Sequence, residues 1–120
     1  MSYTRLNPKQ EKTYTGSQVA TAASGYTFNS SSVATKRNGM VALTMNFSTS
    51  SAYTAGTEIK IGTIANDLKP KVPSYGFTWT ADFSQFYVDT NGDIKARLGH
   101  NVSANGSLSW MRLHYMAATP

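Results

Sequence analysis

The sequence predicts an all-β fold, an antiparallel β-sandwich or barrel of about seven to eight short strands. Apolar and polar residues alternate along several segments, which is the period of a half-buried strand. Residues typical of turns separate these segments at intervals of roughly ten residues. No segment sustains the 3.6-residue period of an amphipathic helix. Together these observations favour a protein built almost entirely from strands and turns.

Length and composition agree with one small domain. The chain has 120 residues, of which 14% are charged and 12% aromatic, so it does not have the composition of a disordered tail. The absence of cysteine excludes a disulfide scaffold, a zinc ribbon and a cysteine nucleophile. No apolar run approaches the roughly 18 residues of a membrane span. Residues 1–12 are polar and lack the apolar core of a signal peptide.

Residues 1–30 are weakly patterned, and we expect them to form an N-terminal lead-in or connector. Residues 31–120 are expected to form the β-sandwich head domain. Its first hairpin is the clearest feature of the chain. Val33–Arg37 is a strand, Asn38-Gly39 is the strongest short hairpin signal, and a second strand covers residues 40–48. In that second strand the side chains predicted to point into the core are Val41, Leu43, Met45 and Phe47.

Further strands follow at the expected spacing. Residues 57–64 form a strand in which Ile59 and Ile61 share a face. The crossing at residues 66–73 contains two prolines, which cannot lie in a central strand. The remaining predicted strands are residues 75–81, with Tyr75, Phe77, Trp79 and Ala81 on one face; residues 85–90 and 93–98, joined by Asn91-Gly92; and residues 107–116.

The basic charge balance does not predict a nucleic-acid partner. The formal net charge is +5, but the basic residues are scattered and only Lys36 and Arg37 are adjacent. A solvated basic surface explains such a distribution better than a binding stripe.

No catalytic motif is found, and we expect neither an enzyme nor a cofactor or metal site. Residues 89–93 resemble a calcium loop only faintly, because the glycine is fourth rather than sixth and His100 stands where the bidentate glutamate belongs. A hairpin is the better interpretation. A polysaccharide-degrading enzyme would need two carboxylates aligned across a cleft, and Glu58 and Asp82 are a candidate pair. With six dispersed acids, a chance occurrence is the simpler explanation.

The last predicted strand carries the candidate ligand-binding residues. If alternation holds, Trp110, Arg112 and His114 share one face, opposite an apolar core face of Met111, Leu113 and Tyr115. An indole, a guanidinium and an imidazole would then lie together on a ligand site or a subunit interface. The alternative is a bulge near Met111 that packs Leu108 and Trp110 inside.

Three further candidate ligand-binding residues rank below this cluster. Trp79 aligns with Tyr75 and Phe77, which favours a core or interface position over a ligand platform. Asp82 follows the same strand, and His100 lies in a polar loop, so both suit the rim of a site. Each of these two side chains is more often simply solvated.

Four segments, taken in order, resemble the C-terminal head domains of bacteriophage tail fibres and of baseplate receptor-binding proteins from phages of Gram-positive bacteria. They are residues 34–47, 61–70, 88–94 and 107–115, and the resemblance covers roughly residues 33–120. In the second segment Lys69 stands where arginine is common in the family. Residues 1–30 lie outside the resemblance.

The resemblance implies a β-sandwich that assembles as a homotrimer at the tip of a phage tail and binds a host cell-surface saccharide without covalent chemistry. It also implies contacts with other tail or baseplate proteins. A structural assembly domain of the tail is the alternative, in which the Trp110 face is buried against another protein. No ligand residue carries over from the family, because such heads diverge in their sites. The candidate residues therefore rest on strand alternation alone.

Overall fold

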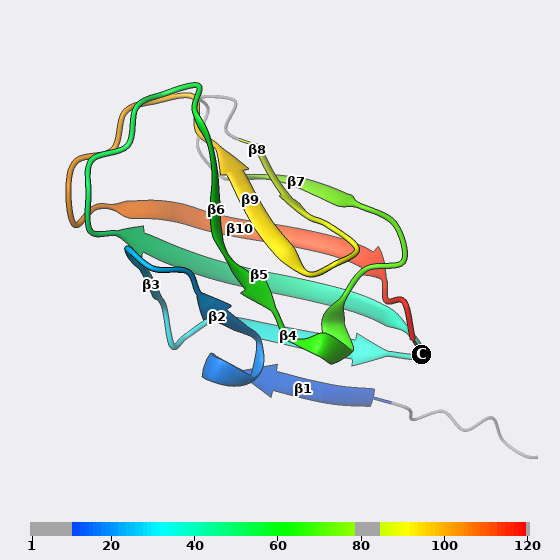
Figure 1. The fold of residues 1–120 in the computed structure, drawn as a ribbon. Coiled ribbons are helices and arrows are strands. Elements are labelled where there is room, and N and C mark those ends of the chain that lie inside the picture. Colours follow the sequence, from blue (N-terminus) through cyan, green and yellow to red (C-terminus); the bar gives the residue numbers. More distant parts are fainter. Residues whose placement is uncertain (1–10, 79–84, 120) are drawn as a thin grey trace, which may run out of the picture.

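The computed structural model describes residues 11–78 and 85–119. The described chain forms an all-β, sandwich-like structure of two antiparallel layers with five strands each (Figure 1). The strands are β1 (Glu11–Thr15), β2 (Ala20–Ala22), β3 (Tyr26–Phe28), β4 (Val33–Arg37), β5 (Met40–Thr49), β6 (Glu58–Ile64), β7 (Ser74–Thr78), β8 (Gln85–Val88), β9 (Asp93–Arg97) and β10 (Ser107–Met116). Two short 3-10 turns, η1 (Gly16–Gln18) and η2 (Asn66–Leu68), interrupt them.

The two layers are joined along one side. The first layer has the order β1-β4-β5-β10, with β3 also paired to β5, and the second has the order β7-β8-β9-β6-β2. Strands β10 and β7 pair through Met111 with Thr78 and Arg112 with Phe77, so the outer surface continues from one layer to the other. In Figure 1, β6 and β9 cross in front of β5 and β10. The prediction of an all-β fold is confirmed.

The described strands number ten, more than the seven to eight predicted, because residues 11–28 supply three of them. Strand β1 pairs with β4, β2 with β6, and β3 with β5. The described part of the expected lead-in is therefore built into both layers. Weak sequence patterning there reflects very short strands rather than an absence of sheet pairing.

The first hairpin matches its prediction. Strand β4 has the predicted bounds, and Asn38 and Gly39 have φ values of 51° and 85°, as a two-residue turn with both central residues left-handed requires. The second Asn-Gly forms a longer turn, in which only Gly92 of the pair has positive φ. The Gly92 N–H donates to the Asp89 carbonyl at 2.9 Å, and the Asp89 N–H donates to the Asp93 carbonyl at 2.9 Å. This is a type I turn followed by a glycine bulge.

The core lies between the layers, where the predicted faces meet. Strand β5 contributes Val41, Leu43, Met45 and Phe47, all buried as predicted. Strands β8, β9 and β10, with the residue that follows β9, contribute a further set of buried side chains: Phe86, Val88, Ile94, Ala96, Leu98, Met111, Leu113 and Tyr115. Burial of these side chains is the main source of stability in a cysteine-free chain of this size.

One predicted strand face is confirmed and another needs correction. In β6, Ile61 is fully buried and Ile59 packs partly buried against the core, so the two share the inner face as predicted, although the register shifts between Lys60 and Gly62. In β7 the face of Tyr75 points outward, and this side chain is 59% exposed. The neighbouring position 76 faces inward. It is a glycine because a Cβ there would lie only 2.7 Å from the Arg112 carbonyl oxygen. Trp79 and Ala81, predicted on the same face as Tyr75, lie outside the described residues.

Three side chains of the first layer fasten η2, which follows β6. The Tyr14 hydroxyl donates to Asp67 Oδ2 at 2.8 Å, and Lys36 Nζ donates to the Asp67 carbonyl at 2.8 Å. The Tyr115 hydroxyl donates to the Leu68 carbonyl at 2.7 Å. Burial, with the neighbouring Asp67 carboxylate, raises the pKa of Tyr14 to about 12. These bonds connect the proline-rich crossing to β1, β4 and β10.

Candidate functional site

Strand β10 places the predicted cluster on the outer face of the first layer. Met111, Leu113 and Tyr115 are buried, whereas Arg112 and His114 are exposed and Trp110 is half-buried. A bulge lies between Ser107 and Trp110, earlier than the alternative interpretation required. It leaves Trp110 on the face opposite Met111, so the alternation prediction holds from Trp110 onward. The side chain of Leu108 is outside the described part of the structure.

An open groove of about 330 Å³ lies beside this strand, and we call it the Trp110 groove. It is lined by Ser31, Thr44, Trp110 and Arg112. The pairing of β10 with β5 explains two of these neighbours, because Arg112 lies opposite Thr44 and Trp110 lies opposite Asn46. Side chains directly opposite one another in a sheet share a face.

Asn46 explains how Ser31 reaches the groove. This buried residue accepts a backbone bond from Asn29 N–H at 2.9 Å, and its own N–H donates to Ser32 Oγ at 3.2 Å. The Asn29 side-chain amide also donates to Asn46 Oδ1 at 3.4 Å. The loop tightens further where Ser31 N–H donates to Asn29 Oδ1 at 2.8 Å. The segment 29–32 is thus held against β5, next to Trp110.

The groove combines three kinds of recognition group. The indole offers a flat apolar ring, the guanidinium offers a fixed fork of donors with a permanent positive charge, and the two hydroxyls donate and accept hydrogen bonds. Such a set suits a small polar ligand with an apolar face and an anionic group. Nothing in it resembles a nucleophile paired with a base.

The remaining predicted site residues are placed as follows. His114 lies on the same face as Arg112, opposite Ala42, but does not line the groove. His100 is half-buried in the loop between β9 and β10, with buried Leu98 and Val102 on either side in sequence, and does not line the groove either. Trp79 and Asp82 lie outside the described residues.

Two groove residues were missed by the sequence analysis. The alternation of β5 does predict Thr44 on the outer face, but its place beside Arg112 depends on the β5–β10 register. Ser31 has no such signal, because it lies in a loop whose position depends on long-range bonds to Asn46. The tyrosine pair described next was missed as well.

The outer face of the second layer carries a second group of side chains, the Tyr75–Tyr87 pair. The ring centroids are 5.0 Å apart with an interplanar angle of 28°. The Tyr87 hydroxyl donates to Glu58 Oε2 at 3.3 Å, and Lys95 Nζ lies 5.8 Å from the Tyr87 ring centroid. Burial and the nearby Glu58 carboxylate raise the pKa of Tyr87.

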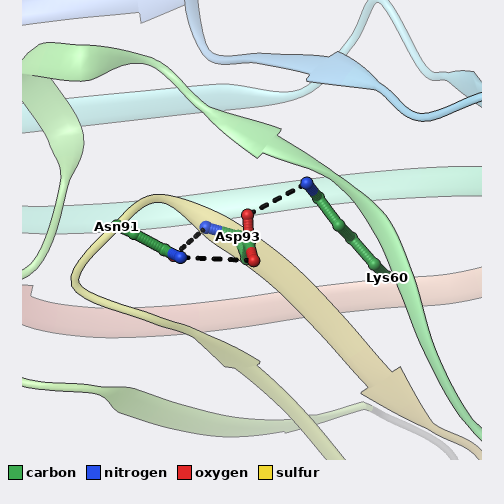
Figure 2. Close-up of polar contacts among 3 residues, drawn as sticks. All are labelled: Lys60, Asn91 and Asp93. Carbon is green, nitrogen blue, oxygen red and sulfur yellow. Dashed lines mark hydrogen bonds and ion pairs between the residues drawn. The ribbon is translucent and has the colours of Figure 1, made fainter.

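The turn between β8 and β9, whose sequence faintly resembles a calcium loop, is held by side-chain contacts of Asp93. Figure 2 shows Asp93 between Lys60 and Asn91. Lys60 Nζ lies 3.0 Å from Asp93 Oδ1, and the Asp93 N–H donates to Asn91 Oδ1 at 2.9 Å. The hydrogen bond from Lys60 is the main reason that the pKa of Asp93 is lowered. Asp93 is thus paired with Lys60 of β6 and bonded to Asn91 within its own turn.

Within residues 11–78 and 85–119, no three His, Cys, Asp or Glu side chains gather where a metal ion could be held. The described chain also contains no helix that is long and apolar enough to span a membrane. Searches against protein-family models, curated proteins and solved structures gave no match.

Proposed function

We propose that the protein is a non-catalytic adhesin module of a bacteriophage tail, which binds a saccharide of the host cell wall in the Trp110 groove. The observation that carries the binding proposal is the placement of an indole and a guanidinium beside two hydroxyls around one open groove. The phage tail tip, the homotrimer and the other tail proteins as partners rest on the resemblance of residues 33–120.

Each lining residue has a physical role in this proposal. The Trp110 ring packs against the C–H face of a sugar, which excludes water from both apolar surfaces. Arg112 pairs with a phosphate of the wall polymer through charge-assisted hydrogen bonds, and Thr44 and Ser31 bond to sugar hydroxyls. Other exposed or partly exposed cations, such as Lys69, Lys71 and Arg97, add attraction to an anionic polymer. A weak single site becomes effective when several copies bind one polymer.

A pull-down with purified, phosphate-containing wall polymer of a Gram-positive bacterium tests the proposal. Trp110→Ala and Arg112→Ala are each expected to lower the retained protein about tenfold. Val72→Ala is the matched control, because Val72 is the most exposed large apolar side chain of the described residues, at 62%, and does not line the groove. Unchanged retention of both groove variants would remove the Trp110 groove as the binding site.

One observation favours the assembly alternative. Met40 and Met116 lie opposite each other at the end of β5 and β10, and each is 49% exposed. They share the outer face with Arg112 and His114, so a protein partner covering them would also approach the groove. Under this alternative, Met40→Ser with Met116→Ser lowers the molar mass measured by light scattering. Under the adhesin proposal, no protein partner covers the groove, so the same double variant binds as much polymer per subunit as the parent protein.

A further inference from the structure

The Tyr75–Tyr87 pair lies on a face that the proposed function does not use. Tyr75 is 59% exposed although its neighbours in sequence, Ser74 and Gly76, are less exposed. The two rings are stacked at 28°, so each covers one face of the other, and Tyr75 keeps the larger accessible surface. Exposed Tyr75 and half-buried Tyr87 therefore offer a flat aromatic surface of the kind against which a sugar ring can pack.

Tyr87 is held in place by polar contacts, and Tyr75 stacks on it. The Tyr87 hydroxyl is fixed by Glu58 at 3.3 Å, and Lys95 Nζ lies 5.8 Å from the same ring centroid. Tyr87 therefore sits between a cation and the Tyr75 ring, in a defined orientation. Preorganised side chains lose less conformational entropy when a ligand binds.

The strand register sets a row of side chains across four strands. Tyr75 pairs with Tyr87, Tyr87 with Lys95, and Lys95 with Lys60. With neighbouring strands about 4.8 Å apart, this row is about 14 Å long. A parallel row of Gln85, Arg97 and Glu58 runs beside it. Flat rings at one end thus continue into hydrogen-bonding groups at the other.

The charges on this face are mixed in sign and nearly balanced. Lys60 is paired with Asp93 at 3.0 Å, Glu58 lies beside Tyr87 and opposite Arg97, and Lys95 lies over the Tyr87 ring. This mixture of cations and carboxylates suits a neutral ligand that both donates and accepts hydrogen bonds better than a polyanion, which would meet Glu58 and Asp93. A sugar ring brings hydroxyls, which donate to carboxylates and accept from ammonium groups, together with an apolar C–H face for the rings.

We propose that Tyr75 and Tyr87 form a second saccharide subsite, which binds a neutral pyranose ring against Tyr75, while Glu58 and Lys95 hold Tyr87 in place behind it. The inference rests on the proposed function, since it assigns a second and chemically different part of a wall polymer to the same chain. The Trp110 groove binds the anionic part, and the Tyr75–Tyr87 pair binds a neutral sugar.

The test is an NMR titration of the full chain with three neutral probes: the methyl glycosides of glucose, galactose and N-acetylglucosamine. At least one of them is expected to shift the ring resonances of Tyr75 and Tyr87 in a saturable manner. Tyr75→Ala is expected to weaken that binding about tenfold, and Tyr75→Phe to leave it within about threefold because the ring remains. Val72→Ala again serves as the exposed control.

The failures of the two proposals are distinguishable. If none of the three glycosides shifts Tyr75 or Tyr87, or if the shifts persist unchanged in Tyr75→Ala, the subsite is overturned whatever the wall polymer does at Trp110. If oligothymidylate shifts the pair and the sugars do not, the face is a nucleic-acid surface and the subsite is likewise overturned. If Trp110→Ala and Arg112→Ala are both retained by the wall polymer as well as the parent protein, only the Trp110 groove is overturned.

Discussion

Two adjacent serines show how finely burial separates structural from binding roles. Ser32 is 1% exposed and its Oγ accepts the Asn46 N–H at 3.2 Å, whereas Ser31 is exposed and lines the Trp110 groove. Ser32→Ala leaves a buried N–H without its acceptor, so we expect a loss of about 1–3 kcal/mol in the free energy of unfolding. Urea denaturation measures this. Ser31→Ala is the control and is expected to stay within about 0.5 kcal/mol; equal losses would contradict the account of the loop.

Tyr115 gives a second prediction for a single atom. Its hydroxyl donates to the Leu68 carbonyl at 2.7 Å, and the ring is 6% exposed. Tyr115→Phe leaves that carbonyl buried without this donor, and we expect a loss of about 1–3 kcal/mol in urea with an unchanged m-value. Tyr75→Phe removes a hydroxyl from an exposed ring and is expected to have little effect on stability. A Tyr115→Phe protein as stable as the parent would refute the role of this bond in fastening η2.

Tyr14 predicts a dependence of stability on alkaline pH. Its pKa is raised by burial and by Asp67, from 10.0 to about 12, so the folded state keeps a proton that the unfolded chain releases. The stabilisation is therefore fully present below pH 10 and is lost as the pH rises from 10 through about 12. Urea midpoints measured across this range check it. Tyr14→Phe is expected to lose less stability over the same interval; identical slopes would contradict the assignment to Tyr14.

At the scale of elements, the junction of β10 and β7 joins the two layers. Among the described residues it includes two residue pairs, and a Cβ at Gly76 would lie 2.7 Å from the Arg112 carbonyl oxygen and 3.0 Å from Leu113 Cγ. Gly76→Ala is expected to force the strands apart and cost about 1–3 kcal/mol. It should also speed amide exchange at the β7–β10 pairs and weaken polymer binding, because Arg112 moves. Unaltered stability and exchange would show that β7 shifts without cost.

The elements also show what sequence patterns can predict. Local signals were sufficient for β4, the Asn38-Gly39 turn and the inward face of β5, because a two-residue turn and side-chain alternation depend only on neighbouring residues. The bulge in β6 was not predicted, since it depends on Gly62 approaching Thr21 and Phe47 of other strands. The outward face of Tyr75 depends likewise on the close contact of Gly76 with β10.

The same division holds for the candidate site. Trp110, Arg112 and His114 were predicted to share a face because they alternate along one strand. The groove itself depends on which residues of β5 lie opposite them and on a loop held by Asn46, and neither is encoded locally. His100 could not be placed from its loop composition, because its position depends on how residues 98–102 pack at the end of the sandwich.

For the whole molecule, the joined edge between the layers has a functional consequence. The outer surface runs without a sheet edge from β5 through β10, β7, β8 and β9, so the Trp110 groove and the Tyr75–Tyr87 pair belong to one continuous sheet surface. A wall polymer crossing the β10–β7 junction would reach both. If one polymer molecule spans both positions, we expect Tyr75→Ala and Trp110→Ala each to lower the affinity measured for the polymer and the double variant to lose about the sum of both free energies, because both sites contribute to one bivalent constant. Titration calorimetry on the single and double variants measures this; a polymer affinity that depends on only one of the two residues would contradict it.

The central claim is that the Trp110 groove binds saccharide. NMR mapping of the full chain with a purified phosphate-containing wall polymer fragment tests it most directly. The account predicts the largest saturable shifts at Ser31, Thr44, Trp110 and Arg112, with Met40 and Met116 little affected. Shifts concentrated at Met40 and Met116, or none at the four groove residues under conditions where the polymer binds, would contradict it.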